Sequence, residues 1–575
     1  MQNRHLLWIL WGAVFFITGP GLIEPYQIFR ALFILILALE CLGLPDRQSS
    51  GRWFIPKPFL WIGASITWSA LSIIWAYNLV ESVWTLFLYF TPVISLLVVS
   101  QKWGKHHSLI AWVGYLGWIY ALIVAVLLVS NGIRHGWTNQ ELYRIHYPSG
   151  HKSMIAAILV GWFPFMLNSD LPKKAIQGWV LLALALILFL QSRAAFLALL
   201  AFGVIWLLHQ PIRWKTYRKL WVIPVIGLLI WWINPGRIRL RIHPSYILQS
   251  PTASDRLVMW QKTLHLIREE PLSGFGLGQW KVQWPALGIP SNQYYSDKDE
   301  EVVWTHAHND WLETTAELGL PGSLLLFLFL ASVWYYSGYL DPKLKSYSRA
   351  LVGAYIMFSI FDFPRLRLDI QWIYLSWWVW SLRTTTVSGL SFKVNIPLKI
   401  ASAGVLALMI TYGMFHYADE YWVRKLWLAR AAKQPDKIIA LAGKINRSVM
   451  NLDEAAVPID WYAGMAALDK GQQADALNDF RQARLVHPNH HDVWNNLGVI
   501  YFQQSQLDSA IICFGKAKQI APSRWEYTRN LVNAYAAGAQ YSEALKILDN
   551  WKDNADEKEA LRRKIVEFQK ASTSN

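Results

Sequence analysis

The chain has 575 residues, of which 54% are hydrophobic and only 16% are charged, and it contains 34 tryptophans. This composition is typical of a polytopic membrane protein and excludes a single soluble globular domain. The formal net charge of +16 is spread over loops between apolar runs, so no nucleic-acid partner is predicted. Cys41 lies in an apolar run and Cys513 in a polar tail, so neither a disulfide framework nor a thiolate metal site is expected.

Apolar runs long enough to cross a bilayer recur from Leu6 to about His416. Each crossing needs roughly 20 residues, which gives about 12–13 transmembrane helices. The first run lacks a small-residue cleavage site, so it is expected to be retained as a span. The sequence therefore predicts an all-α polytopic helical bundle over residues 1–416.

The basic loops indicate the orientation, because lysine and arginine accumulate on the cytoplasmic side of a membrane protein. Every second loop is basic, which places these loops and the N-terminus in the cytoplasm. Residues 131–150, the large loop 234–320 and everything after His416 are then extracytoplasmic. The basic loops contain Arg47, Arg52 and Lys57; Lys102 and Lys105; Lys173 and Lys174; Arg213, Lys215, Arg218 and Lys219; Lys343, Lys345 and Arg349; and Arg383, Lys393 and Lys399.

A few arginines depart from this rule, namely Arg134, Arg144, Arg193, Arg365 and Arg367. A guanidinium group near the bilayer is costly unless it pairs with a charge or binds a ligand. Arg193 lies in a turn too short to carry its side chain far from the membrane. It is suited to a diphosphate, and the alternative is an arginine that extends to lipid headgroups.

The large loop contains a second basic element, a predicted helix that begins near Ser254 and ends at Pro271. Arg256 and Trp260 lie four positions apart and so share one face of this helix. The alternative is an ordinary amphipathic surface helix. The glycines of residues 274–278 follow a helix and not a strand, so we interpret them as a tight turn that returns the loop to the membrane domain and not as a nucleotide site.

His306 and His308 lie where the large loop ends and a membrane helix begins. Asp310, Glu313 and Glu317 are nearby, but no third nitrogen or sulfur ligand is evident, so no metal is predicted. Imidazole titrates near neutrality, and an acceptor hydroxyl needs its proton removed as it attacks a sugar carbon. One histidine is therefore expected to act as a base, and the alternative is a histidine that only packs the loop against the helix.

Taken in order, these elements resemble the O-antigen ligase and polymerase superfamily of membrane glycosyltransferases over residues 60–385. The signature of that superfamily is a His-Asn pair followed by Leu, then Glu-x-Gly-x-x-Gly. One departure is Ala194, where the family often has glycine after the Ser-Arg pair. The matching segments are Ser192-Arg193, Arg256 with Trp260, residues 271–276, His308-Asn309 and Glu317-Leu318-Gly319.

The resemblance implies a C-type glycosyltransferase-like bundle and an undecaprenyl-diphosphate-linked glycan as donor. It assigns the diphosphate to Arg193 and Arg256 and the activation of the acceptor hydroxyl to His308. The transfer is expected to need no metal and no cofactor, because the energy is stored in the donor. The residues expected to support the site are His306, Asn309, Glu317 and Trp260.

After His416 the sequence changes to a helical tail with an internal period. Ala476, Ala510 and Ala544 are spaced at 34 residues, which is the period of tetratricopeptide repeats. We expect a linker or degenerate repeat at 417–456, an α-solenoid of these repeats at 457–556 and a C-terminal helix or tail at 557–575. The solenoid is either a docking surface for a protein partner or a stabilising appendage.

Three related functions fit these features: ligation of a lipid-linked glycan to a glycan or lipid acceptor, polymerisation of such glycans, and transfer of an oligosaccharide to a protein hydroxyl. They share one predicted active site and differ in the acceptor. A transporter or a non-catalytic scaffold that presents the repeats is the alternative of a different class. The unusual charges gather at one interface and not at mid-membrane, which favours chemistry over transport. The predicted location is the inner membrane, where membrane lipids surround the helical bundle and the repeats lie on the extracytoplasmic side.

Overall fold

The computed structural model describes residues 2–18, 27–43, 52–103, 108–135, 147–209, 251–290, 304–385, 389–551 and 555–573. Arg47, Lys105, Arg144 and the basic loop from Arg213 to Lys219 lie outside these residues, as do parts of the large loop. The chain divides into two compact units. Unit 1 comprises Met1–Ile74, Trp84–Leu277 and Ala307–Tyr417, and unit 2 comprises Trp75–Val83, Gly278–His306 and Ala418–Asn575.

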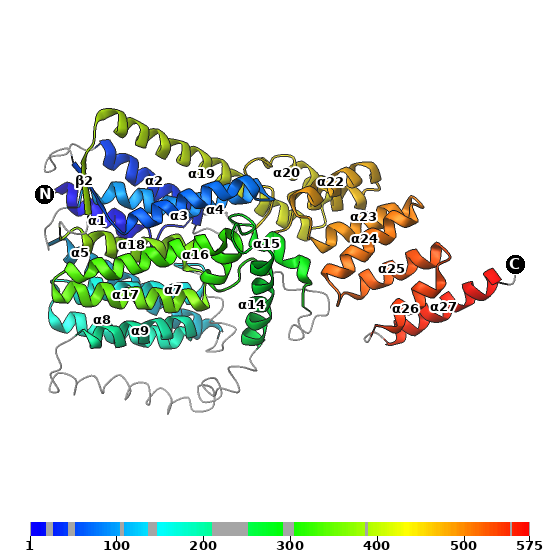
Figure 1. Cartoon of the computed structure of the whole chain (residues 1–575), viewed down its shortest axis with the longest axis horizontal. Coiled ribbons are helices and arrows are strands. Elements are labelled where there is room, and N and C mark those ends of the chain that lie inside the picture. The colour runs from blue at the N-terminus through cyan, green and yellow to red at the C-terminus, as the bar shows by residue number, and fades with distance from the viewer. Residues whose placement is uncertain are drawn as a thin grey trace, which may run out of the picture. The chain divides into compact units, whose positions relative to one another are not determined.

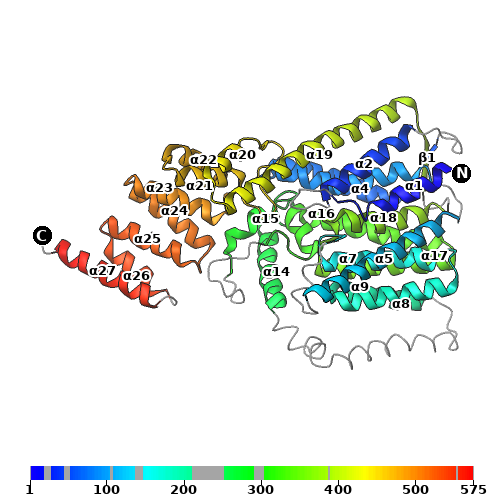
Figure 2. The same cartoon turned by 180° about the vertical axis from the view of Figure 1, so that it is seen from behind.

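Unit 1 is a bundle of long helices (Figures 1 and 2). Short 3₁₀ turns interrupt it at η1 (Ile73–Trp75), η3 (Ser337–Tyr339) and η4 (Pro364–Leu366). Its helices are α1 (Gln2–Ala13), α2 (Gln27–Gly43), α3 (Phe59–Ser72), α4 (Leu79–Ser100), α5 (Ser108–His135), α7 (Lys152–Leu167), α8 (Lys173–Leu190), α9 (Arg193–Leu208), α14 (Pro251–Glu269), α16 (Asp310–Tyr336), α17 (Pro342–Phe361), α18 (Leu368–Leu382) and α19 (Ile396–Ala431). The start of α4, up to Val83, and the end of α19, from Ala418, are assigned to unit 2.

Several helices of this bundle are suited to a membrane by length and composition. Among the described residues, five are long and apolar enough to cross a bilayer, and three shorter apolar helices accompany them. The predicted all-α membrane fold is therefore confirmed, whereas the predicted number of spans stays a prediction. The five long candidates are Leu79–Ser100, Val113–Arg134, Lys173–Leu190, Asp310–Tyr339 and Ile396–Ala431.

The centre of unit 1 is formed by α18 and α7, whose side chains are buried on almost every face. Helices that are apolar all round belong in the interior of a bundle. The indole Nε1 of Trp11 donates to the Ser376 hydroxyl at 2.8 Å, and that of Trp372 donates to the Trp11 carbonyl oxygen at 3.2 Å. Trp11 and Trp372 thus bury large apolar area while their indole nitrogens stay hydrogen-bonded.

Two short strands pair at one end of unit 1. Strand β1 (Arg52–Pro56) is antiparallel to β2 (Gly389–Lys393), with Arg52 opposite Lys393. Helices α9 and α17 lie side by side over most of their length. Arg349 Nη1 lies 3.1 Å from His209 Nε2, and Ile205 packs against the Cα of Gly353, so the two helices are antiparallel.

Unit 2 contains the helical repeats, and in them the expected paired helices are confirmed. A side chain on Gly498 would meet the ring of Phe514 at 2.7 Å, so glycine allows these two helices to approach. Ala510 and Phe514 pack against Leu531 and Ala534 of the next repeat. The elements are α15 (Trp280–Gln283), η2 (Trp284–Leu287), α20 (Pro435–Ala442), α21 (Ile459–Asp469), α22 (Gln473–Val486), α23 (His491–Gln503), α24 (Leu507–Ile520), α25 (Trp525–Ala537), α26 (Tyr541–Asp549) and α27 (Ala555–Thr573).

Candidate active site

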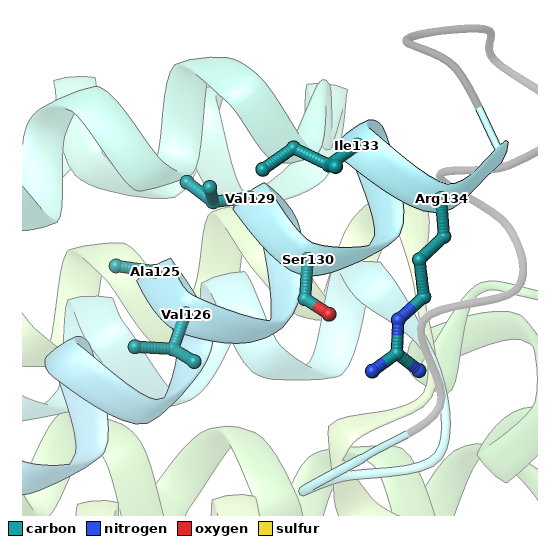
Figure 3. Close-up of a pocket in the computed structure, with 6 residues that line it drawn as sticks. All are labelled: Ala125, Val126, Val129, Ser130, Ile133 and Arg134. Carbon is teal, nitrogen blue, oxygen red and sulfur yellow. The ribbon is translucent and has the colours of Figure 1, made fainter.

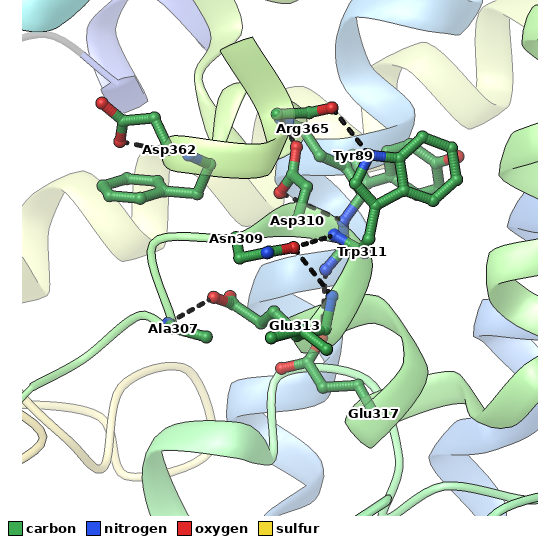
Figure 4. A network of polar contacts seen from close by, with 12 residues as sticks. Tyr89, Ala307, Asn309, Asp310, Trp311, Glu313, Glu317, Asp362 and Arg365 are labelled. Carbon is green, nitrogen blue, oxygen red and sulfur yellow. Dashed lines mark hydrogen bonds and ion pairs between the residues drawn. The ribbon is translucent and has the colours of Figure 1, made fainter. Parts of the chain in front are cut away.

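The loop before α16 is held by the first turn of that helix (Figure 4). The Asn309 side chain caps the helix, since its Oδ1 accepts hydrogen bonds from the backbone amides of Trp311 at 3.0 Å and Leu312 at 3.1 Å. Glu313 Oε2 accepts a hydrogen bond from the Ala307 amide at 2.7 Å. Between these two ties His308 has a φ of 48°, which non-glycine residues rarely adopt. The two ties thus flank His308 and hold its backbone in a conformation that is unfavourable for most residues other than glycine.

The imidazole of His308 faces a buried carboxylate. Its Nδ1 lies 3.6 Å from Oδ1 of Asp362, and the Phe363 ring contacts it edge to face at 5.2 Å between centroids. The Asp362 side chain is 4% exposed, whereas that of His308 is 36% exposed although its Nδ1 is buried. The accessible part of the ring is therefore the edge away from Asp362, which is the arrangement of a base oriented by a carboxylate.

Asp362 stays ionised in this site. Burial on its own raises the pKa of this carboxyl group, but the nearby imidazole of His308 and the guanidinium charge of Arg256 act in the opposite direction and outweigh burial. The net result is a pKa of Asp362 below its usual value. A carboxylate that keeps its charge can hold a proton on the near nitrogen of the imidazole and leave the far nitrogen free to accept one.

The helix α14 contributes Arg256 and Trp260 to this cluster, and the prediction that they share one face is confirmed. The indole Nε1 of Trp260 donates to the Ala307 carbonyl oxygen at 3.0 Å, and its ring lies 6.2 Å from that of Phe361. Arg256 is half-buried one turn earlier and acts electrostatically on Asp362. Trp260 thus contacts the loop that carries His308, and Arg256 acts on the carboxylate that faces His308.

Arg193 is the first residue of α9 and is exposed. Ser192 caps this helix, accepting a hydrogen bond from the Ala195 amide at 3.3 Å. Because α9 is antiparallel to α17, the start of α9 lies at the same end of the pair as Phe361, the residue before Asp362. This register places Arg193 at the Asp362 end of unit 1, and its role in binding stays a prediction.

The loop that carries Asp362 is fixed to α16 by a buried ion cluster. Arg365 Nη2 lies 3.2 Å from Glu317 Oε2, and its backbone amide donates to Asp310 Oδ2 at 2.8 Å. All three residues are almost fully buried, so the expectation that an arginine at this depth must pair is confirmed for Arg365. Figure 4 shows Asp310, Glu317 and Arg365 converging from two segments far apart in the sequence. The contact of Glu317 with Arg365 makes it a support of the loop.

A second buried arginine brings in the loop before α7. Arg367 Nη2 donates to the Ser149 carbonyl oxygen at 2.8 Å, and its Nε lies 4.0 Å from Asp369, which also pairs with Arg30 at 2.6 Å. His151 follows in this loop and lies close enough to Asp362 for their charges to interact. Burial lowers the pKa of His151 to about 4, and its Nδ1 accepts a hydrogen bond from the Ser153 amide at 3.3 Å. His151 is therefore neutral at pH 7.

His306 falls in unit 2, so the geometry of the His308 cluster assigns it no role. Within the residues that the structure describes, no three side chains of His, Cys, Asp and Glu come together in a way that would hold a metal ion. The Asp362 carboxylate has the imidazoles of His308 and His151 and the guanidinium group of Arg256 close enough for electrostatic interaction. Such a set can remove a proton and can bind an anion.

Comparisons with known proteins agree with this chemistry. Residues 178–328 match the family model described as O-antigen ligase, and residues 491–524 match that of the tetratricopeptide repeat. Residues 178–328 are thus similar to the O-antigen ligase family. This match includes Arg193, Arg256, Trp260 and His308, and with the apolar helices it identifies a multi-pass membrane protein.

Three similar proteins from Rickettsia are provisionally named polysaccharide ligases. That of Rickettsia conorii is 25% identical over 273 residues, which cover 45% of this chain and 62% of the relative. That of Rickettsia bellii is 29% identical over 202 residues, which cover 30% and 46%. That of Rickettsia typhi is 22% identical over 415 residues, which cover 65% and 95%. In the first two comparisons the chain thus spans less than two thirds of the relative's length.

An interruption of α16 near the end of the matched region accounts for the first glycine of the Glu-x-Gly-x-x-Gly motif. Gly319 has a φ of 66° and interrupts α16, so the carbonyl groups of the preceding turn lose their helical partners. The Phe275 amide donates to the Ala316 carbonyl oxygen at 3.0 Å, and the Gly276 amide donates to that of Glu317 at 2.8 Å. The turn at residues 274–276 therefore lies against α16 of unit 1, as predicted for a turn onto the membrane domain, and from Gly278 the loop belongs to unit 2.

Asp362 and His151 lie outside the residues that match the O-antigen ligase model, and neither was predicted as a site residue. A lone aspartate after an apolar helix forms no local pattern, but its neighbours Arg365 and Arg367 are exceptions to the charge rule. Those two arginines were the available signal of a polar site here. A charged group at a membrane-helix end needs a partner, which indicates that carboxylates or ligands lie nearby.

A shallow groove of about 450 Å³ runs along α5. Arg134 lies at one end of this groove, and Figure 3 shows its guanidinium group extending from the last turn of the helix. The rest of the lining is almost entirely apolar: Ala125, Val126, Val129, Ser130 and Ile133. The groove is suited in its chemistry to an apolar chain with an anionic end.

Proposed function

We propose that this protein transfers a glycan from an undecaprenyl-diphosphate-linked donor to an acceptor hydroxyl on the extracytoplasmic side of the inner membrane. The observation that carries the proposal is the pair of His308 and Asp362, in which the carboxylate faces Nδ1 and the far edge of the ring stays accessible. Such a pair is suited to general-base catalysis. The O-antigen ligase match and the polysaccharide ligase relatives support the same reaction class.

In the proposed reaction, Nε2 of His308 takes the proton of the acceptor hydroxyl while the oxygen forms a bond to the anomeric carbon. The bond from that carbon to the diphosphate oxygen breaks, and the lipid diphosphate leaves with the electron pair. Asp362 holds the other ring nitrogen and stabilises the imidazolium that forms. Attack opposite the leaving group inverts the anomeric centre, which NMR of the product tests.

Guanidinium groups stabilise the charge that develops on the leaving diphosphate. Arg256 acts on the same carboxylate that faces His308, so it lies close to the reacting groups. Arg193 lies at the same end of unit 1 and would complete the phosphate site. The groove that ends at Arg134 offers an apolar surface to the isoprenoid chain.

The proposed orientation is supported by which loops meet. Arg52 and Lys393 belong to two loops assigned to the cytoplasm, and their strands pair with each other. His151, Arg256, His308 and Asp362 come from connections assigned to the opposite side. Segment Trp75–Val83 belongs to unit 2 together with the large loop and the repeats, which agrees with a common side for all three.

The decisive experiment is in vitro transfer by the purified full chain, with an undecaprenyl-diphosphate glycan as donor and EDTA present. Lipid, glycan and protein acceptors are offered separately, and the products are scored by mass, so the acceptor class distinguishes ligase, polymerase and protein transferase. H308A should abolish transfer. H265A is the control, because His265 is exposed on α14 and pairs with Glu269 in a surface contact at 3.3 Å. Wild-type turnover by H308A refutes the proposal.

A further inference from the structure

The large loop enters unit 2 between the two parts of the candidate site. Arg256 and Trp260 precede this excursion, and His308 follows it, while the intervening segment Gly278–His306 belongs to the same compact unit as the repeats. Its described part, residues 278–290 and 304–306, is therefore shaped by contacts with the repeats.

The first of these contacts are hydrogen bonds from the solenoid to the backbone of the loop. Asn489, in the turn between α22 and α23, is buried, and its Nδ2 donates to the Val282 carbonyl oxygen at 2.9 Å. At the end of α24 the Ile520 carbonyl oxygen accepts a hydrogen bond from the Ile289 amide at 2.6 Å. The match to the tetratricopeptide model covers residues 491–524, so Ile520 lies within the matched repeat and Asn489 lies two residues before it.

A buried amide cluster joins a third segment to the loop and the solenoid. Asn78 exchanges two side-chain hydrogen bonds with Asn451, each of 3.1 Å, and its Nδ2 also lies 3.3 Å from the Val486 carbonyl oxygen. The Gln279 side chain bonds both the amide and the carbonyl group of Asn78 at 2.9 Å. Lys281 Nζ lies 2.7 Å from Glu81 Oε1. Buried polar networks that are satisfied in this way hold one geometry.

Contacts within the loop extend this order towards the catalytic residue. The Trp284 indole Nε1 donates to the Trp304 carbonyl oxygen at 2.7 Å, and the two rings lie 5.2 Å apart. Trp304 precedes His308 by only four residues in the chain. A chain of contacts thus runs from Asn489 through Val282 and Trp284 to Trp304, all within unit 2.

We propose that the repeats are a positioning element of the transferase and that Asn489 and Asn78 are positioning residues. They fix residues 278–290 and, through Trp284, Trp304, from which the chain leads directly into the His308 loop. This proposal rests on the proposed function for its effect on turnover, but the order of the segment is independent of any reaction. The position of the residues just before His308 matters because a small displacement of a base strongly reduces the rate of proton transfer.

The test uses isosteric variants in the full-length protein in nanodiscs. N489D keeps the shape of the side chain but removes the donor to Val282. N78D keeps Oδ1, which caps α4 through the Glu81 amide at 3.1 Å, and loses the donor to Asn451 and Val486. N530D is the matched control, since Asn530 Nδ2 donates at 2.9 Å to Asn495 within the solenoid.

Hydrogen exchange followed by mass spectrometry should show amides of residues 279–290 exchanging about tenfold faster in N489D and N78D, the factor that corresponds to one lost buried hydrogen bond. N530D should leave this peptide unchanged. For transfer, kcat should fall about tenfold in the first two variants while KM for the donor changes little. Unchanged exchange in both variants overturns the inference, as does faster exchange with the wild-type kcat. Exchange is measured without substrate, so it tests the inference even if no transfer is found.

Discussion

The Trp260 indole donates a hydrogen bond to the Ala307 carbonyl oxygen and so joins the helix that carries Arg256 to the loop that carries His308. Trp260 and Ala307 both lie in unit 1, and the segment of the large loop that belongs to unit 2 lies between them in the sequence. The proposed anion-binding residue and the proposed base are therefore coupled by one side chain.

Replacement of this tryptophan should lower turnover with little loss of stability. W260F keeps most of the ring but removes the hydrogen bond, which is worth about 1 kcal/mol, so kcat should fall by roughly fivefold to tenfold. W311F is the matched control, since the Trp311 indole donates instead to Ser359, at 2.9 Å. Steady-state kinetics of both variants decide, and equal losses would contradict a specific role for Trp260.

Removal of the Asp362 charge should reduce catalysis more than binding. D362N takes away the carboxylate that holds Nδ1 of His308, and kcat should fall by about 10²-fold or more while KM for the donor changes much less. D341N serves as the control, because Asp341 caps the other end of α17 through the amides of Lys343 and Leu344 and is exposed. If D362N turns over like the wild type, the His308–Asp362 pair is not the base.

The buried ion cluster should show strong coupling in a double-mutant cycle. R365M leaves the carboxylates of Asp310 and Glu317 without their cation and should cost about 3–5 kcal/mol of stability. E317Q alone should cost less, and R365M/E317Q should recover part of the loss because one uncompensated charge is gone. Thermal unfolding of the four proteins in one detergent gives the coupling energy. Additive losses would show that the contact carries no pairwise energy.

The interruption of α16 should tolerate only glycine. A Cβ on Gly319 would lie 2.0 Å from the Leu272 carbonyl oxygen at a φ of 66°, so G319A should destabilise the protein by about 3 kcal/mol or more. G203A on α9 is the control, since a Cβ there would meet no atom of the described residues within 4 Å and alanine favours a helix. Melting temperatures should therefore fall for G319A and stay level or rise for G203A. Equal melting temperatures for G319A and the wild type would contradict the strain at this position.

His151 should make stability depend on pH. Its pKa is about 4 in the folded protein, below the ordinary value of 6.5, so the unfolded chain binds a proton first as the pH falls. The stability present above pH 6.5 is lost between about pH 6.5 and 4, by about 2 kcal/mol after allowance for its partial exposure. H151Q should flatten this part of the curve. An unchanged pH dependence of the melting temperature in H151Q would contradict the assignment.

The membrane class, the helical fold and the repeats were predictable because each depends on local patterns. Apolar length, basic loops and the 34-residue period can all be read along the chain. The grouping of Arg256 and Trp260 was also predictable, since four positions along a helix define a face. Asp362 was not, because its place opposite His308 depends on Arg365 reaching Asp310 and Glu317 on another helix. Such a contact leaves no mark in the local sequence.

The composition of unit 2 has a consequence for biogenesis. It is assembled from Trp75–Val83, Gly278–His306 and Ala418–Asn575, so it cannot form until ribosomes have reached the final quarter of the message. The early helices are thus synthesised long before unit 2 can be completed. Translation products that stop before Ala418 therefore lack the largest part of unit 2.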